Sequence, residues 1–222
     1  MVGATELISS LRDELTPVSE RIRHHPYVTA LEEGTIPTER LSLFAGEQYH
    51  TIKNDLRSFA LLLSRQQDTR LMRFLVGSVV YEAAALEALY DFAAALGMTQ
   101  ESMEAYQPLA GAHAYTTFLG ITAAYGTVGE MAAAYVIDLE GWGGNCRKIS
   151  KALRNRYGFS EADVSFFDHF AAEDPDFERR SLEMIDIGLD AGLEPLAVRR
   201  TSRLMLEYEL MYWDALLEAS AP

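Results

Sequence analysis

The chain has 222 residues, of which 49% are hydrophobic, and its 33 acidic and 19 basic residues give a formal net charge of -14 at neutral pH. This length and apolar content suffice for one full hydrophobic core, and no Pro/Gly/Ser-rich linker divides the chain, so we expect a single domain over residues 1–222. The acidity argues against nucleic acid as a partner, because a phosphate backbone would be repelled on average.

The sequence has neither the pattern of a membrane span nor that of an export signal. No apolar run approaches the roughly 20 residues that cross a bilayer. The first residues lack a basic flank followed by an apolar core, which is typical of a signal peptide. Cys146 is the sole cysteine, so no internal disulfide can form, and this suits a reducing compartment. We expect a cytoplasmic protein with no membrane partner.

Apolar residues recur at intervals of three and four in the first half of the chain, which predicts helices. Thr5 is a candidate N-cap for the first helix, which Pro17 interrupts before it ends at residue 24. A turn over 34–38 leads into a second helix that ends at about residue 65. A third helix is expected over about 69–96, where Gly97 can close it.

The second half continues in the same way. After a short segment capped by Thr99, a fourth helix is expected over about 110–125. The fifth contains the stretch Met-Ala-Ala-Ala at 131–134, whose small side chains let neighbouring backbones approach closely and favour a central position. Three glycines at 141, 143 and 144 each weaken this helix by about 1 kcal/mol relative to alanine. They predict a bend or a backbone that faces a ligand.

The last part of the chain has further helix signals. Ser160 and Asp163 resemble a capping box at the start of a sixth helix. Pro175 then kinks or restarts that helix, with Asp174 as a possible new cap, and a last helix is expected over about 195–218. With about seven helices joined by short turns, the chain is predicted to be an all-α bundle.

Several motifs occur in an order that resembles a known family. His-Pro-Tyr-Val at 25–28 precedes Glu-Gly-Thr-Ile-Pro at 33–37, and Tyr-Glu-Leu-Met-Tyr-Trp-Asp occupies 208–214. Ala-Tyr-Thr-Thr at 114–117 and Gly-Glu-Met-Ala-Ala at 129–133 lie between them. Together they resemble the TenA/PqqC branch of the haem-oxygenase-like superfamily. The resemblance implies a haem-oxygenase-like bundle that forms a homo-oligomer.

TenA proteins are hydrolases that cleave or deaminate thiamin-derived pyrimidines. The resemblance places the family's catalytic glutamate at Glu209 and a substrate-contacting tyrosine at Tyr115. The position of the family's cysteine nucleophile falls on Asp138. Cys146 lies eight residues later, roughly 12 Å along an α-helix axis, and cannot replace it without a different backbone.

The remaining substrate-binding positions also differ from the family pattern. An acidic position on the second helix falls on Gln48, and a tyrosine one turn later falls on Thr51. We expect Trp142 and Phe170 to line the same pocket as aromatic walls. The main hypothesis is therefore a TenA-like enzyme without a cofactor that acts on a small nitrogen-containing molecule. Glu209 and Asp138 are its candidate acid and base groups.

Two alternatives remain open. A second branch of the superfamily binds two metal ions and activates dioxygen, and the corresponding oxygen and nitrogen donors suit an iron or manganese pair. Those donors here are Glu82, Glu140 (or Asp138), His169, Glu173 and Asp176. The other alternative is a non-catalytic protein that binds a small molecule. Haem is not expected, because a proximal histidine belongs near the start of the first helix and the histidines here lie at its end.

Overall fold

The structure is a computed structural model that describes residues 3–172 and 174–220, and every regular element within those ranges is a helix. The all-α prediction is therefore confirmed. In the described residues, no helix combines the length and the apolarity that crossing a membrane requires. The elements are α1 (Ala4–Arg23), α2 (Pro26–Glu33), the 3-10 helix η1 (Thr38–Arg40), α3 (Leu41–Ser64), α4 (Thr69–Ala95), α5 (Gln100–Ala105), α6 (Ala110–Tyr125), α7 (Val128–Arg156), α8 (Ser165–Ala171), α9 (Phe177–Asp190) and α10 (Pro195–Ser220).

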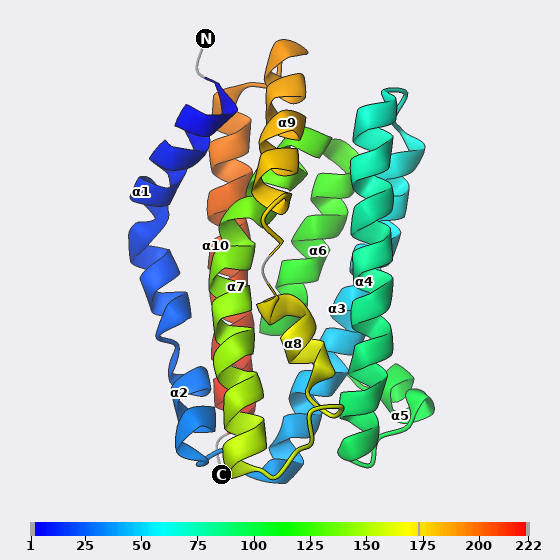
Figure 1. The fold of residues 1–222 in the computed structure, drawn as a ribbon, viewed down its shortest axis with the longest axis vertical. Coiled ribbons are helices and arrows are strands. Elements are labelled where there is room, and N and C mark those ends of the chain that lie inside the picture. The colour runs from blue at the N-terminus through cyan, green and yellow to red at the C-terminus, as the bar shows by residue number, and fades with distance from the viewer. Residues whose placement is uncertain (1–2, 173, 221–222) are drawn as a thin grey trace.

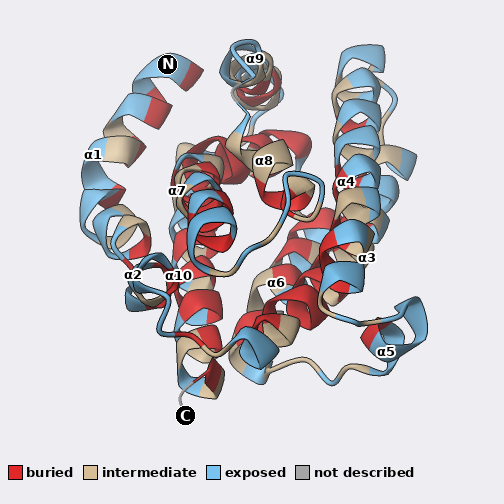
Figure 2. Ribbon diagram, turned by 60° about the horizontal axis from the view of Figure 1, so that its bottom comes forward, coloured by how far each residue is buried: buried red, intermediate tan, exposed pale blue. Residues whose placement is uncertain are grey.

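The long helices run side by side (Figure 1), and five of them form a closed ring of contacts together with α8. α7 packs against α10, α10 against α6, α6 against α3, α3 against α4, and α4 returns to α7 through the short helix α8. α1, α2 and α9 cover the outer side of α7. Figure 2 shows buried residues concentrated on α6, α7 and α10. The described residues form seven long helices, as expected, and the interior of the ring is open to side chains from six helices, namely α3, α4, α6, α7, α8 and α10.

Helix α1 differs from the sequence prediction in two ways. The helix is continuous from Ala4 to Arg23, so Pro17 does not interrupt it. A proline inside a helix removes one backbone hydrogen bond, and neighbouring packing can keep the remaining helix intact. Thr5 is not the N-cap either, because the helix begins one residue earlier, where the backbone N–H of Ala4 donates to Oδ1 of Asp186 on α9 at 2.7 Å.

The glycines of α7 serve close packing, and the helix continues through them without a break. A Cβ atom added at Gly143 would lie 2.8 Å from the backbone carbonyl oxygen of Phe170. One added at Gly141 would lie 3.2 Å from Cγ2 of Ile22. The absence of side chains therefore lets α8 approach α7 on one side and lets α1 approach it on the other.

The segment before α9 contains the predicted hydrogen bonds of the capping box, but the helix begins later than predicted. The N–H of Ser160 donates to Asp163 at 2.7 Å, and the N–H of Asp163 donates back to the Ser160 hydroxyl at 3.3 Å. Regular helix nevertheless starts only at Ser165. After Pro175, Oδ1 of Asp174 accepts the N–H of Asp176 at 3.0 Å, and α9 begins at the next residue.

Candidate functional site

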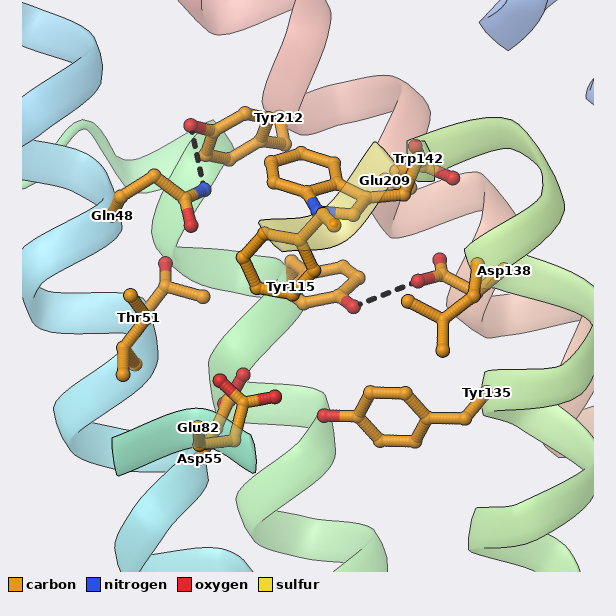
Figure 3. A pocket seen from close by; sticks show the side chains of 13 residues that line it. Gln48, Thr51, Asp55, Glu82, Tyr115, Tyr135, Asp138, Trp142, Glu209 and Tyr212 are labelled. Carbon is orange, nitrogen blue, oxygen red and sulfur yellow. Dashed lines mark hydrogen bonds between the residues drawn. The ribbon is translucent and has the colours of Figure 1, made fainter. Parts of the chain in front are cut away.

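The interior of the helix ring contains a cavity of about 30 Å³, which is room for roughly two water-sized groups. Figure 3 shows its polar and aromatic side chains pointing toward one another from different helices. α3, α4, α6, α7, α8 and α10 all contribute to it. The lining residues are Gln48, Thr51, Ile52, Asp55, Glu82, Tyr115, Tyr135, Asp138, Leu139, Trp142, Phe170, Glu209 and Tyr212.

The structure brings both predicted catalytic residues and all five predicted substrate-binding residues to this cavity. They come from regions of the chain that are separated by up to about three quarters of its length. The residues concerned are Asp138, Glu209, Tyr115, Gln48, Thr51, Trp142 and Phe170.

Asp138 and Glu209 form an interacting pair of buried carboxyl groups, each about 1% exposed. The Tyr115 hydroxyl donates to Oδ2 of Asp138 at 3.0 Å, and the Trp213 indole N–H donates to Oε1 of Glu209 at 3.0 Å. The other two oxygens, Oδ1 of Asp138 and Oε2 of Glu209, are buried with no donor from the described residues. A proton held between the two carboxyl groups would give both oxygens a partner.

The electrostatic environment favours that shared proton. Burial raises the pKa of Asp138, and hydrogen bonds from Tyr115 and Glu209 partly offset the rise. Burial also raises the pKa of Glu209 well above its usual range, and the nearby charge of Asp138 raises it further. Because like charges at close range cannot both ionise readily, the pair keeps one proton near neutral pH.

A second pair of buried carboxyl groups, Asp55 on α3 and Glu82 on α4, lies on another side of the cavity (Figure 3). The Thr116 hydroxyl donates to Oδ1 of Asp55 at 2.7 Å. Burial raises the pKa of both carboxyl groups, and the charge of Asp55 raises that of Glu82 further. The Tyr135 hydroxyl points toward this pair, is buried, and has no partner among the described residues.

An aromatic wall and one amide complete the lining. Nε2 of Gln48 donates to the Tyr212 hydroxyl at 2.8 Å, which fixes both side chains. The Trp142 ring meets Tyr212 edge to face at 5.9 Å and meets Phe170 in the same way at 5.8 Å between ring centroids. These contacts leave flat apolar surfaces beside the carboxyl groups, which suits a planar ligand.

A larger groove of about 1430 Å³ lies beside the cavity and is lined mainly by residues of α4, α7, α8 and α9. Four residues line both spaces and thus separate them, namely Glu82, Tyr135, Leu139 and Phe170. The groove and the cavity therefore adjoin one another at these four side chains.

The candidate metal ligands do not converge. Glu82 lines the cavity, whereas Glu140 lies outside and its Oε1 is 2.7 Å from the Arg12 guanidinium. The His169 ring lies against Tyr81 at 4.1 Å, and the exposed Asp176 pairs with Arg179 at 3.1 Å; Glu173 lies outside the described residues. Within the described part of the chain, no three His, Cys, Asp or Glu side chains are grouped to hold a metal ion.

Helix geometry explains the placement of Glu140. It follows Asp138 by two residues on α7, which rotates it about 200° around the helix axis. When Asp138 points into the ring, Glu140 must therefore point out of it. The sequence interpretation that treated these two residues as interchangeable ligands is not compatible with one continuous helix.

Three lining residues with polar side chains were not among the predicted site residues. Asp55 follows Thr51 by four positions and Gln48 by seven, so the helical period places all three on one face of α3. Tyr135 precedes Asp138 by three positions and shares its face of α7 in the same way. The same period, applied from Glu209, also points to Tyr212. The helical spacing in the sequence therefore indicated all three of these residues.

Comparison with known proteins gives consistent results. Residues 12–219 match the family described as TENA/THI-4/PQQC. Over 130 residues the chain is 26% identical to the aminopyrimidine aminohydrolase of Halalkalibacterium halodurans, and this alignment spans 57% of each protein. The chain thus covers little more than half of that relative's length.

Solved structures show the same fold. A TenA homologue from P. horikoshii OT3 superposes with a TM-score of 0.78 at 20% identity, covering 98% of this chain and 100% of the homologue. Heme oxygenase-1 from the cyanobacterium Synechocystis, solved with heme, gives a TM-score of 0.70 at 12% identity and covers 96% and 91% of the two chains. The predicted haem-oxygenase-like fold is confirmed.

Haem does not fit the cavity of this chain. Its described lining contains no histidine that could serve as an axial ligand, and it places four carboxyl groups where an anionic, largely apolar macrocycle would lie. The lining itself supplies carboxyl, phenol and amide groups.

Proposed function

The chain belongs to the TENA/THI-4/PQQC family, and we propose that it is a hydrolase of a small nitrogen-containing heterocycle in which Asp138 and Glu209 transfer protons. The observation that carries this proposal is the buried, interacting carboxyl pair at the wall of the cavity inside the helix ring. Its similarity to a protein named aminopyrimidine aminohydrolase supports the substrate class. Two carboxyl groups with raised pKa values supply both an acid and a base near neutral pH.

The hydrogen bonds assign the two roles. Tyr115 donates to Asp138 and so stabilises its anion, which makes Asp138 the base that takes a proton from water. Glu209, whose pKa burial raises well above its usual range, keeps its proton and donates it to the departing nitrogen. Water adds to the ring carbon that bears the amino group, the C–N bond breaks, and ammonia leaves with the proton from Glu209. The product carries a hydroxyl group where the amine was.

This scheme needs no covalent intermediate on a thiol. The resemblance to TenA proteins places their cysteine nucleophile at Asp138, and a carboxylate at that position activates water more readily than it displaces an amine. Cys146 is fully buried and does not line the cavity. Burial also raises the pKa of its thiol well above the usual range, which suppresses the nucleophilic thiolate.

Substrate binding requires an opening of the cavity. Sites that bury small molecules typically have a volume of about 300–1,000 Å³, far more than the 30 Å³ of this cavity. Phe170 and Leu139 separate the cavity from the groove, and rotation of these two side chains would join the two spaces. We propose that the heterocycle enters by this route and stacks between the aromatic walls.

Ammonia release from a panel of aminopyrimidines, beginning with 4-aminopyrimidine, tests the proposal. Asp138→Asn and Glu209→Gln should each lower kcat by about 100-fold or more, because each removes one proton-transfer group. Glu140→Gln is the matched control, since it lies on the same helix as Asp138 but faces Arg12 on the outside, and it should retain activity. Unchanged turnover in Glu209→Gln, or no turnover of any aminopyrimidine by the wild-type protein, would refute the proposal.

A further inference from the structure

The second carboxyl pair has no role in the proton transfers described above. Building on the proposed function, we propose that Asp55, Glu82 and Tyr135 form a separate subsite of the same cavity that binds a protonated amine nitrogen. This subsite would select substrates that carry a cationic amine away from the reacting carbon.

The three side chains converge from three helices. Asp55 is 4% exposed, Glu82 5% and Tyr135 8%, so all three are shielded from bulk water. Thr116 satisfies one oxygen of Asp55, whereas Glu82 accepts no hydrogen bond from any described residue. The Tyr135 hydroxyl is aimed at the pair but bonds to neither carboxyl group (Figure 3). Buried polar groups are rarely left without partners, so a missing group belongs between them.

Charge identifies the class of that group. None of the described residues that line the cavity is Lys, Arg or His, so no protein cation neutralises its carboxyl groups. A protonated amine would supply a positive charge and up to three N–H donors, enough for both carboxyl groups and the Tyr135 oxygen. A hard metal ion needs about six oxygen ligands, and the described residues offer no cluster of three candidate metal-binding side chains. The small volume of the cavity also admits a group of the size of an ammonium ion.

An amine of this kind has two possible sources. It can be a side chain of the substrate, held while Asp138 and Glu209 act on the ring, or it can be the ammonium ion formed after the C–N bond breaks. The recognised chemistry is the same, but only a substrate amine changes which substrates bind. A free ammonium ion would instead inhibit as a product and compete for the subsite.

Two probes of equal size and different charge provide the test, namely benzylamine and benzyl alcohol, titrated calorimetrically at neutral pH. Wild-type protein should bind benzylamine about tenfold or more tightly than the alcohol, because charge-assisted hydrogen bonds to buried carboxylates are strong. Asp55→Asn and Glu82→Gln should each remove that preference. Glu47→Gln is the matched control, since Glu47 is also buried on α3, does not line the cavity, and accepts hydrogen bonds from Tyr106 and Leu109.

The other possible results of these titrations either overturn the subsite or identify its occupant. Equal affinity for the two probes, no binding of either, or an unchanged preference in both variants would overturn the subsite. Competition by ammonium chloride with an unchanged ranking of aminopyrimidine substrates would identify the product ion as the occupant. Should the variants not fold, the titration of the wild-type protein still decides. An amine that takes the place of the proton held by Asp55 and Glu82 must release that proton to the buffer, so benzylamine binding without proton release would overturn the subsite. Failure of the proposed function shows separately, as unchanged turnover in Glu209→Gln.

Discussion

Replacement of Asp55 by asparagine should stabilise the protein at alkaline pH. Asparagine has nearly the same shape, and its side-chain oxygen can still accept the Thr116 hydroxyl. Its amide group can also donate to Glu82, which replaces a repulsion between like charges by a hydrogen bond. The substitution therefore removes the cost of burying a charge while it keeps the packing.

The size of the effect follows from proton linkage. Burial raises the pKa of Asp55 to about 8, whereas the unfolded chain releases this proton near pH 4. The native state thus holds more protons than the unfolded state between these pH values, and its free energy of unfolding falls as pH rises, by about 1.4 kcal/mol per pH unit for one proton. Over three pH units the upper limit is about 4 kcal/mol. Relaxation and water entry reduce it, so we expect about 1–3 kcal/mol.

Urea unfolding followed by circular dichroism, at several pH values from about 5 to about 8, measures this difference. The variant and the wild type should have similar stability at the acidic end and should diverge as pH rises, with the variant more stable. Glu140→Gln removes the same formal charge from the surface and should not reproduce the divergence. Parallel pH profiles for wild type and Asp55→Asn would show that Asp55 does not retain a proton in the native state, which would refute the reasoning.

Two further predictions concern side chains on α6 and α7. Tyr115→Phe removes the hydrogen bond that lowers the pKa of Asp138, so the pKa of Asp138 should rise. We expect kcat to fall about tenfold and the acidic limb of the pH–rate profile to move to higher pH. A profile that does not move would contradict the role assigned to Asp138. Gly143→Ala should destabilise the protein by about 1–2 kcal/mol in thermal unfolding, because its Cβ would meet the backbone of Phe170. Gly144→Ala, with nothing within 4 Å, should instead stabilise it by up to about 1 kcal/mol, and equal effects at the two glycines would contradict the packing argument.

Much of the architecture could be predicted because it depends on local sequence. The long helices follow apolar periodicity, and the end of α4 follows from Gly97, which adopts the left-handed conformation. The His25-Pro26 motif has a local explanation as well, since Nδ1 of His25 accepts the N–H of Tyr27 at 3.2 Å and so caps α2. By contrast, the cap of Ala4 comes from Asp186, which is 182 residues away, and no local pattern could indicate it.

The site was predictable only where one helix fixes the phase. Once Asp138 is placed in the interior of the ring, the helical period places Glu140 on the exterior. In the same way, the helix face that carries Gln48 and Thr51 also carries Asp55. What the sequence could not show is which side chains of different helices meet, because this depends on tertiary packing around the ring. The meeting of Asp55 with Glu82 is of that kind, and it changes the interpretation of Glu82 from a candidate metal ligand to one half of a carboxyl pair.

Four carboxyl groups from four helices, Asp55, Glu82, Asp138 and Glu209, face one cavity without a cation among its described lining residues. A purely structural role would favour apolar side chains there, since burying a carboxyl group without a partner costs several kcal/mol and well-packed hydrophobic residues are often at least as stable. The ring around them is otherwise well packed, with Trp213 fully buried against Glu209. Such a cost, repeated four times at one point, is typical of an active site, where raised pKa values serve proton transfer and the binding of a cationic ligand. Stability gained by neutralising any of the four should therefore be accompanied by a loss of binding or turnover.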